Sequence, residues 1–446
     1  MKKINLFLIT MLMAVFSIQI FATENIPKEH KLEKMEKTHS EKMKKMILKN
    51  EWKKDMIINF DFFNRTRFYG SKDDSNDWND QFTQKTVFGM KAMKRGMGMA
   101  VFQLRNASIL GVGYPQSHIG TDALSVYQAY GQFKLPFGVH SCLYFGRKEI
   151  NIDTQYIFGA VGFSDLGKTF DTAGLKMVFM NKKLKLNIFH VRQFEKDAGL
   201  NDEILNTLHT RYDLNKNMGF SFLFINDMLN MATSNKKSYM SHLIGFRANG
   251  KLNFGFNFNF EAYYQFGDNI TIGSGKATDG SVSAYAVLLD LSYSLKNIAP
   301  KPTLGLLINM NSGDDDTTDD TNKNFLVAMG TKHKWFGLMD IFMNPENWGG
   351  QGVMDISPYV NWTCAFNKAI SFKFNYHYFM PLVKVDNTDK KSLGMEFDLS
   401  TKIAFNKMFS FVGTFGYYVP GDLQKESITL VKDKKIMAYG AFQVKF

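Results

Sequence analysis

Arginine is used selectively in this chain, which holds eight Arg against 46 Lys. A guanidinium presents a planar fork that binds carboxylates and other oxyanions through two parallel hydrogen bonds. Most of the Arg lie in stretches where apolar and polar residues alternate, and alternation puts every second side chain on one face of a strand. In residues 56–69, Phe60, Phe62 and Phe68 share one face, so Asp61, Arg65 and Arg67 lie on the other. These Arg either attract anionic solutes or pair with carboxylates on neighbouring strands.

The same alternation extends to the other apolar-polar stretches and predicts further charged side chains on the polar face. Glu261 is the acidic exception within its stretch, and we expect it to pair with Arg247 on the adjoining strand. The full set of residues predicted on this face by alternation is Arg105, Lys176, Lys185, Arg211, Arg247, Glu261, Lys373, His377, Glu396, Asp398 and Lys402.

Catalytic and metal chemistry find little support in the sequence. His190, His209, His242, His333 and His377 are scattered, and no nucleophile motif accompanies them, so no enzyme is predicted; such histidines are expected to form hydrogen bonds in a lumen. No cofactor is expected.

An acidic run contains Asp314, Asp316 and Asp319 and could bind Ca²⁺ through carboxylate oxygens. Its spacing matches no known calcium loop, so a solvated acidic loop is the favoured interpretation.

Residues 252–266 show most clearly the alternating pattern on which the prediction of a polar face rests. Leu252, Phe254, Phe256, Phe258, Phe260, Ala262, Tyr264 and Phe266 occupy the even positions, and polar residues or glycine occupy nearly all odd ones. A soluble strand has about 5–6 residues. A tilted transmembrane strand needs about 9–11 residues. This stretch is therefore typical of a strand in a membrane β-barrel, with one face toward lipid and the other toward water.

Eighteen such stretches predict an all-β fold, a transmembrane outer-membrane β-barrel of about 18 antiparallel strands with short periplasmic turns and long extracellular loops. The strand ending at Phe446 must pair with the first, because lipid tolerates no open sheet edge. Pro358 inside a strand is expected above the bilayer or at a bulge. The predicted strands are 56–69, 85–93, 97–107, 123–135, 141–150, 171–180, 184–194, 205–214, 218–229, 240–249, 252–266, 282–295, 303–312, 353–366, 369–381, 392–405, 408–419 and 435–446.

Turns and loops alternate between these strands. Four turns centred on Asn181, Asn215, Asn367 and Asn406 each read apolar-Asn-Lys, and Asn tolerates the positive φ of tight hairpins. Long polar segments are expected as extracellular loops, and loop 314–352 either folds inward as a plug or outward as a contact surface. The expected loops are 70–84, 108–122, 267–281, 314–352 and 421–434.

The chain start predicts export. Residues 1–22 combine Lys2 and Lys3 with an apolar run and Ala22, the pattern of a secretory signal peptide, with an uncleaved anchor helix as the alternative. Residues 23–54 form a charged periplasmic extension, partly helical or simply flexible, with eight Lys and five Glu between residues 23 and 50 and a possible periplasmic contact. Residues 55–446 form the barrel. The net charge of +12 is assigned to anionic lipid or solutes, because an exported chain without a nucleic-acid motif gives no reason to expect nucleic acid.

Several motifs, in order along the chain, resemble the alginate export family of outer-membrane porins. Gly146-Arg147-Lys148-Glu149-Ile150 and Gly167-Lys168-Thr169-Phe170-Asp171 resemble two of them. Ser312-Gly313-Asp314, Asn324-Phe325 and His333-Lys334-Trp335-Phe336-Gly337-Leu338-Met339-Asp340 resemble the others. The resemblance implies an eighteen-stranded monomeric barrel with an electropositive constriction and loop gates. It implies Arg147, Glu149 and Lys168 as constriction or rim residues. Because Leu143 and Phe145 share the parity of Arg147, a bulge is needed to turn Arg147 inward.

The sequence therefore predicts a bacterial outer-membrane channel for passive diffusion or export of anionic, saccharide-like solutes through a lumen lined by Arg and Lys. Its expected partners are outer-membrane lipid and anionic small molecules or polysaccharide. A general diffusion porin without strong selectivity, and a surface adhesin or structural barrel, are the alternatives.

Overall fold

The computed structural model describes residues 56–446 except 75–76, 112–123, 137–139, 195–201, 231–237, 317, 344–349, 384–389 and 427–431. The predicted signal peptide and N-terminal extension (1–22 and 23–54) and most of loop 108–122 lie outside the described residues. No helix in the described part is long and apolar enough to cross a membrane.

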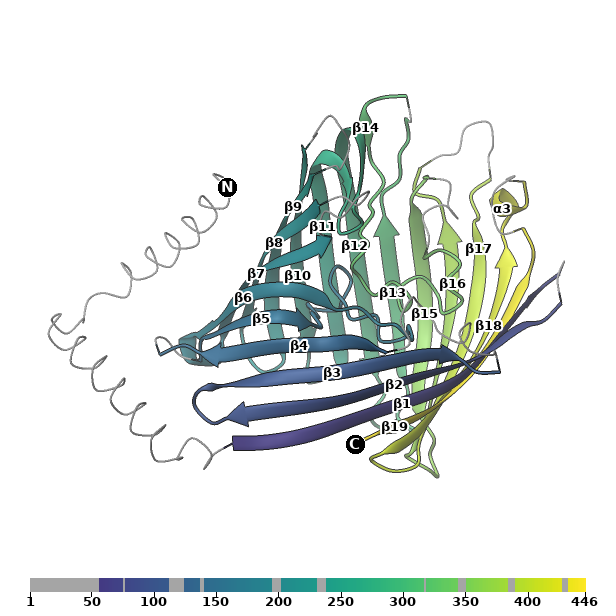
Figure 1. Ribbon diagram of the computed structural model, residues 1–446. Coiled ribbons are helices and arrows are strands. Elements are labelled where there is room, and N and C mark those ends of the chain that lie inside the picture. Colours follow the sequence, from purple (N-terminus) through teal and green to yellow (C-terminus); the bar gives the residue numbers. More distant parts are fainter. Residues whose placement is uncertain are drawn as a thin grey trace, which may run out of the picture. The chain divides into compact units, whose positions relative to one another are not determined.

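Eighteen strands form one closed antiparallel wall (Figure 1), as the alternation predicted. The two-residue strand β14 (Thr321–Asn322) adds a short parallel pairing to β12. The wall strands are β1 (Met56–Asp73), β2 (Asn79–Lys94), β3 (Gly98–Ile109), β4 (Ser125–Lys134), β5 (Cys142–Lys148), β6 (Phe170–Phe179), β7 (Leu184–Phe194), β8 (Asp202–Asp213), β9 (Met218–Asn230), β10 (Ser238–Lys251), β11 (Phe256–Thr271), β12 (Lys276–Ser294), β13 (Thr303–Asn311), β15 (Val353–Thr363), β16 (Ile370–Met380), β17 (Gly394–Ala404), β18 (Phe409–Pro420) and β19 (Lys435–Lys445). The helical pieces η2 (Met180–Lys182) and α3 (Asp422–Glu426) are short.

The first and last strands close the barrel. β1 pairs with β19 over eleven residues, from Phe63↔Lys445 to Asp73↔Lys435. Beyond that ladder, Phe62 N–H donates to Phe446 O at 2.8 Å and Phe446 N–H to Phe62 O at 3.0 Å, with their ring centroids 5.1 Å apart. Every wall strand therefore has two neighbours, which removes the open edge that a bilayer would not tolerate.

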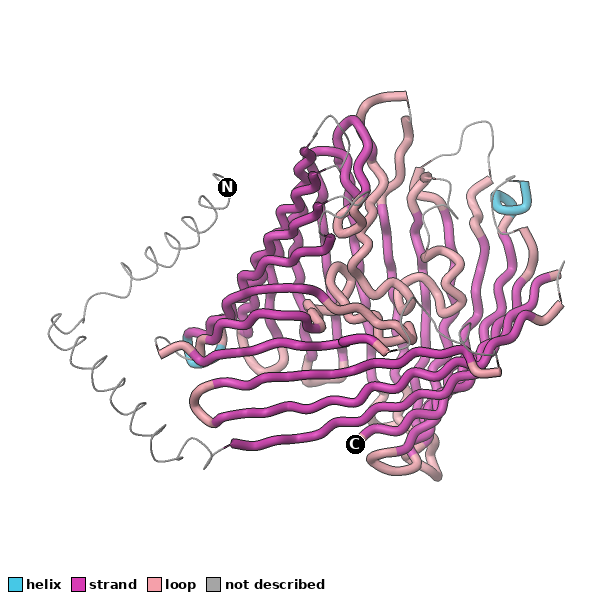
Figure 2. Tube along the Cα trace, in the orientation of Figure 1, coloured by secondary structure: helices cyan, strands magenta, loops and turns pink. Residues whose placement is uncertain are grey.

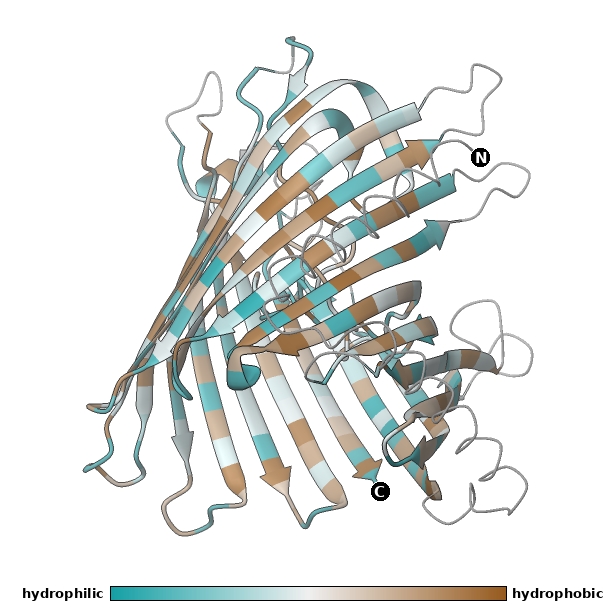
Figure 3. Ribbon diagram, turned by 90° about the vertical axis from the view of Figure 1, so that its left-hand side faces the viewer, coloured by the Kyte–Doolittle hydropathy of each residue, from teal (hydrophilic) through white to brown (hydrophobic). Residues whose placement is uncertain are grey.

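The two faces of the wall differ in the way that alternation requires, as the banded strands in Figure 3 illustrate. On β11, Phe258 and Phe260 lie opposite Leu291 and Leu289 of β12 on the outer face. Glu261 and Tyr263, on the other face, are buried inside the barrel. Tyr263, an aromatic residue at an odd position of this stretch, stacks on Tyr156, which follows β5 in the chain, at 5.7 Å between ring centroids.

Several boundaries differ from the predictions. β11 begins at Phe256, because Leu252–Gly255 forms a turn in which Gly255 has a φ of 105°. The expected loop 267–281 is wrong: β11 and β12 run on to Thr271 and from Lys276, and residues 272–275 form their turn. Most of the expected loop 70–84 is likewise strand. Ladder hydrogen bonds continue in these segments beyond the apolar alternation, which is why composition alone suggested loops.

The four Asn-centred turns lie at one end of the barrel, called here the short-turn end; the opposite end is the long-loop end. Only Asn181 among the four has a positive φ, 54°. Asn215, Asn367 and Asn406 instead accept backbone N–H groups through their side chains, as when Asn406 Oδ1 binds the N–H groups of Met408 and Phe409 at 2.8 Å. These are Asx turns, a second way in which Asn stabilises tight connections.

Pro358 differs from its expected setting. It is the sixth residue of β15, and the register with β16 is the same on both sides of it, Ile356↔Tyr378 and Tyr359↔Asn375. No bulge accommodates it; the paired positions with β16 are simply interrupted at Ser357 and Pro358 while the ladder to β13 continues.

Candidate functional site: a lumen crossed by two inward loops

Two long connections fold into the barrel instead of away from it, visible as loop segments inside the ring of strands in Figure 2. The first inward loop (residues 149–169) joins β5 to β6, and the second inward loop (residues 323–343) follows β14. The second falls within the predicted loop 314–352, and its residues 323–343 fold inward, as the plug alternative predicted, whereas residues 318–322 remain largely exposed beside β12. The first was not predicted as a loop at all.

The first inward loop is fixed to β1 by a buried charge cluster. Arg65 Nη2 donates to Asp165 Oδ1 at 2.6 Å and Arg67 Nη2 to Asp165 Oδ2 at 2.5 Å, and the Asp165 side chain is 3% exposed. Both guanidinium groups also donate to the carbonyl oxygen of Phe163. Burial opposes ionisation of Asp165, but Arg67 and Arg65 outweigh it and hold the pKa of that carboxyl below its ordinary value.

Further cations cover the inner face of β2 to β5 beside this cluster. Lys85 lies over the Tyr127 ring at 5.1 Å, and Lys148 lies over Tyr144 at 4.2 Å. Arg105 donates to Leu166 O and, at 2.8 Å, to Ser125 Oγ. We call Arg65, Arg67, Lys85, Arg105 and Lys148 the basic face. Several of these cations contact carbonyl oxygens and aromatic rings, which orient a cation without neutralising it.

The middle of the first inward loop reaches the opposite wall. Asp153 contacts His209 Nε2 at 3.1 Å, Ser221 Oγ at 2.8 Å and Arg247 Nη1 at 3.4 Å. Burial raises the pKa of Asp153, but His209 and its other partners lower it by more, so the net pKa falls. Arg247 Nε lies 3.0 Å from Glu261 Oε1, and Thr154 Oγ1 donates to Glu261 at 2.8 Å. The expected pairing of Arg247 with Glu261 is thus present and is extended by the loop.

The two inward loops also contact each other. Thr331 N–H donates to Gln155 O at 2.9 Å, Gly159 N–H to Met329 O at 3.1 Å and Lys168 Nζ to Ala328 O at 2.6 Å. His333 stacks on Phe163 at 3.6 Å between centroids. Apolar side chains from both loops pack together and against the wall, with Tyr156, Phe158, Met329, Trp335 and Phe336 all buried. The loops therefore form one plug.

Two buried carboxylates on β17 hold the second inward loop. Asp398 Oδ2 accepts the N–H of Leu338 at 3.0 Å, and Glu396 Oε1 accepts the N–H of Met339 at 2.9 Å. Gly337 precedes them with a φ of 81°, and a Cβ there would collide with the Glu396 carboxylate. His333 and Asp340, 2.7 Å apart, close this turn on itself. The backbone conformation of residues 333–340 therefore places the N–H groups of Leu338 and Met339 within hydrogen-bond distance of the β17 carboxylates.

The turn between β11 and β12 is fastened in a similar way. Gly273 N–H donates to Asp227 Oδ2 and Gly275 N–H to Glu203 Oε2, both at 3.1 Å, and both carboxylates are fully buried. Ala328 N–H of the second inward loop donates to Ile272 O at 3.0 Å. This hairpin tip thus belongs to the plug.

Lysines of the plug lie in a setting that disfavours their charge. Burial, reinforced by the nearby charge of Lys168, lowers the pKa of Lys332 to about 8. Burial also lowers the pKa of Lys168. The charge of the plug is therefore expected to change within an accessible pH range.

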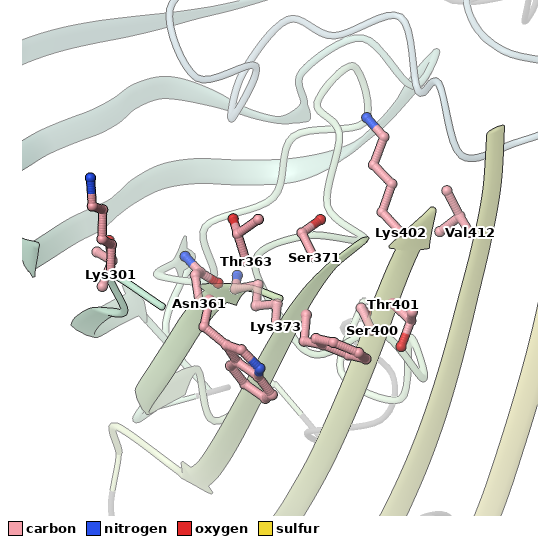
Figure 4. Close-up of a pocket in the computed structure, with 12 residues that line it drawn as sticks. Lys301, Asn361, Thr363, Ser371, Lys373, Ser400, Thr401, Lys402 and Val412 are labelled. Atoms are coloured by element: carbon pink, nitrogen blue, oxygen red, sulfur yellow. The ribbon is translucent and has the colours of Figure 1, made fainter. Parts of the chain in front are cut away.

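A hollow of about 310 Å³ opens at the short-turn end between β13, β15, β16, β17 and β18. Lys301, Lys373 and Lys402 contribute its cations. Asn361, Thr363, Ser371 and Ser400 contribute amide and hydroxyl groups. Lys301, Thr363, Ser371, Lys373 and Lys402 point to the same side in Figure 4, whereas Thr401 points away. Lys373 also lies over the Tyr359 ring at 4.8 Å.

Most of the predicted polar-face residues lie on the inner face. Arg65, Arg67, Arg105, Arg247, Glu261, Glu396 and Asp398 contact the inward loops or one another, as described above. Lys176 lies near Tyr144, 5.5 Å from its ring, and Arg211 pairs with Asp213 at 2.9 Å. Glu149 follows β5 and accepts a hydrogen bond from Tyr127. His377 contacts Asp355 at 2.8 Å.

Arg147 is a correction. No register shift occurs in the pairing of β5 with β4 or β6, so Arg147 stays in phase with the exposed Leu143 and Phe145 on the outer face. Its partner is Asp171, through two bonds of 2.8 Å. The inward cation at this point of the chain is Lys148.

Two predicted lumen histidines are also corrections. Phe189 and Val191 pack in the core inside the barrel, and so does Leu243. His190 and His242, next to them in sequence, therefore lie on the outer face. In the predicted acidic loop, Asp315 and Asp319 pair with Lys323, and Asp316 accepts a hydrogen bond from Thr318. Within the described residues no group of three His, Cys, Asp or Glu side chains could hold a metal ion, so the Asp314, Asp316 and Asp319 candidate is not supported.

The sequence interpretation missed Lys85, Asp153, Tyr156 and Asp165. A signal was present for the loop residues, because residues 151–169 contain the run Tyr156–Val161 with no apolar-polar alternation. A break of that length between two well-patterned strands marks a connection, and its apolar content marks burial.

The comparisons with known proteins decide what kind of barrel this is. The family model described as alginate export matches residues 79–429, most of the chain. The chain belongs to the alginate export family. Among solved structures, OccK11 (OpdR) of Pseudomonas aeruginosa is 11% identical with a TM-score of 0.57, covering 87% of this chain and 96% of its own. The outer membrane protein OprD of Pseudomonas aeruginosa is 14% identical with a TM-score of 0.57, covering 87% and 94%. Acinetobacter baumannii OccAB1 is 14% identical with a TM-score of 0.57, covering 87% and 97%.

No curated protein matches the chain. Family and fold are those of outer-membrane porins and export channels, and the protein is a channel-type barrel of the bacterial outer membrane. The short-turn end is then the periplasmic end and the long-loop end the extracellular one.

Proposed function

We propose that this alginate export family member conducts anionic, saccharide-like solutes passively, with the plug as its constriction. The observation that carries the proposal is the periplasmic hollow, where three lysines stand among amide and hydroxyl groups. An acidic sugar offers a carboxylate to the lysines and hydroxyl groups to the amide and hydroxyl side chains. The volume of about 310 Å³ is at the lower end of small-molecule sites.

The basic face gives the same preference further along the lumen. The Asp165 carboxylate is shared by Arg65 and Arg67, so that two cations face one anion there. Lys85 and Lys148 rest on tyrosine rings. A lumen with this charge distribution raises the local concentration of anions relative to cations.

Reversal potentials in a planar bilayer under a salt gradient test the proposal. The wild-type channel is expected to favour anions, and K301Q/K373Q/K402Q to shift the permeability ratio toward cations. K216Q/K368Q/K407Q removes three lysines from turns at the same end and is expected to change the ratio less. Oligouronate should block the current more strongly than a neutral oligosaccharide of equal length.

Each alternative has its own outcome in this experiment. Cation selectivity of the wild type would overturn the anion proposal. Equal permeability for both signs would indicate a general diffusion porin, and absence of conductance would favour an adhesin or structural barrel.

A further inference from the structure

The outer face of the barrel carries a row of charged side chains at its extracellular end. Arg147 near the end of β5 binds Asp171 near the start of β6, and Asp171 is the register partner of Arg192 near the end of β7. Arg192 in turn contacts Asp202, the first residue of β8, at 3.4 Å. We call Arg147, Asp171, Arg192 and Asp202 the charged row.

The charged row points away from the lumen. Arg147 is in phase with Phe145, which is 50% exposed and stacks on Phe133 of β4. The side chains of Arg147, Asp171 and Arg192 are 45%, 51% and 46% exposed. The solute path inside the barrel therefore does not use them.

A second polar row follows on the membrane side of the first. His190 Nδ1 contacts Asn206 Oδ1 at 3.0 Å, Asn206 Nδ2 donates to Asn226 Oδ1 at 3.3 Å, and Asn226 Nδ2 contacts His242 Nδ1 at 3.3 Å. Each of these residues is the register partner of the next, on β7 to β10. His242 lies between the rings of Phe224 and Phe266. We call these four the amide row.

The position of the two rows limits what can surround them. Charged groups on the lipid face of a barrel are strongly unfavourable at mid-bilayer, and the penalty almost disappears near the interface. The charged row lies within two residues of the strand ends, and aromatic side chains lie below or beside the amide row. The rows therefore fit the headgroup layer of the outer leaflet.

We propose that the charged row and the amide row bind the phosphorylated sugar headgroup of an outer-leaflet glycolipid. A phosphate accepts hydrogen bonds from guanidinium groups in a fixed fork geometry. Asp171 engages two of the five N–H donors of Arg147, Nε and Nη2, so the guanidinium can serve a phosphate as well. Asp171, Asp202 and the amide side chains complement the hydroxyl groups of a sugar. A headgroup that carries both phosphates and hydroxyl groups matches this combination of cationic, carboxylate and amide side chains better than a headgroup with phosphate alone.

Native mass spectrometry of the purified full-length barrel tests the proposal, with diphosphorylated lipid A in mixed micelles as the probe. Wild type is expected to retain lipid A, and R147Q/R192Q to bind it at least about tenfold more weakly, which corresponds to the loss of one charge-assisted contact. The matched control K368Q/K407Q removes two cations from periplasmic turns and is expected to bind like wild type. A faster-migrating unboiled band on a denaturing gel verifies that each variant is folded.

Three results would overturn the proposal: equal lipid A affinity of wild type and R147Q/R192Q, equal retention of phosphatidylethanolamine and lipid A by wild type, or a wild-type dimer joined through this face in place of bound lipid. If R147Q/R192Q does not fold, R147K/R192K takes its place in the binding measurement. This variant keeps both positive charges but loses the planar, bidentate geometry of the guanidinium groups. Unchanged affinity in that variant would also overturn the proposal.

Discussion

Within the part of the chain that the structure describes, Asp165 is the carboxylate that pairs with both buried arginines of β1. Its two oxygens bind Arg65 and Arg67 separately, and neither arginine side chain is more than 12% exposed. Removing one partner of a buried ion pair is costly because the other charge is left without compensation. The stability of the plug and the proposed anion selectivity therefore depend on the same contact.

The substitution D165N is expected to lower the stability of the plug by about 3–5 kcal/mol, the usual cost of breaking a buried pair. It also leaves more positive charge in the lumen. The thermal midpoint in detergent should fall while the permeability ratio moves further toward anions. D315N, at an exposed position, is the control, since Asp315 pairs with Lys323 at the surface. Unchanged stability of D165N would show that the cluster does not hold the first inward loop.

The lowered pKa of Lys332 predicts a pH dependence of the channel with a defined sign. Burial, followed by the charge of Lys168, lowers its pKa to about 8. Raising the pH from 7 to 9.5 therefore removes a positive charge from the plug, and the proposed preference for anions should decline. In K332M that decline should be smaller, as measured by reversal potentials at each pH.

The same linkage predicts how stability changes. The unfolded chain keeps the Lys332 proton up to about its ordinary pKa of 10.5, so the charged form costs stability below about pH 8. That cost should diminish as the pH rises between these values. Identical pH profiles of wild type and K332M would contradict the assignment.

At the scale of elements, the alternation of apolar and polar residues predicted the strands, but no sequence pattern predicted the contacts of the plug. All eighteen predicted wall strands exist, because one lipid face and one wet face leave a period of two that is readable in a single strand. The plug is built from pairs such as Arg65 with Asp165 and Tyr156 with Asn309, about a hundred residues apart or more. No local pattern encodes which carboxylate meets which arginine across a lumen.

For Arg147, the local pattern and the family resemblance gave different predictions of the face on which the side chain lies. Its parity with Leu143 and Phe145 indicated the outer face, while the family resemblance suggested a constriction residue. The strand has no bulge, and the parity was the better guide.

The second inward loop is expected to loosen when its anchor is removed. In E396A/D398A the N–H groups of Leu338 and Met339 lose their acceptors, at about 1–3 kcal/mol for each unpaired group. Single-channel conductance should rise, and proteases should cleave the loop between residues 323 and 343 faster. E396Q/D398N retains an acceptor oxygen at each position, and its conductance should stay nearer to wild type. Equal conductance in all three proteins would mean that the β17 carboxylates do not hold the constriction.

At the scale of the whole molecule, closure of the wall depends on the contact between β1 and β19. Phe446 contributes two backbone hydrogen bonds to Phe62 and a ring contact of 5.1 Å. Every other pairing in the wall joins strands that are consecutive in the sequence, apart from the short β14. The pairing of β1 with β19 joins the two ends of the barrel sequence, so it closes the longest loop and has the highest entropic cost of formation. Local contacts that stabilise the seam should therefore affect assembly more than similar contacts elsewhere.

The substitution F446A keeps the backbone bonds and removes the ring. An aromatic pair contributes about 0.5–1.5 kcal/mol beyond its buried area, so the thermal midpoint should fall modestly. The rate at which the unfolded chain acquires the heat-modifiable form in detergent or lipid vesicles should fall more, because the entropic cost of joining the two ends of the barrel sequence is expected to make the seam the last pairing to form. F366A, at a turn residue that is 92% exposed, provides the comparison. If F446A and F366A fold at the same rate, the Phe446 ring contact does not contribute to the step that limits assembly.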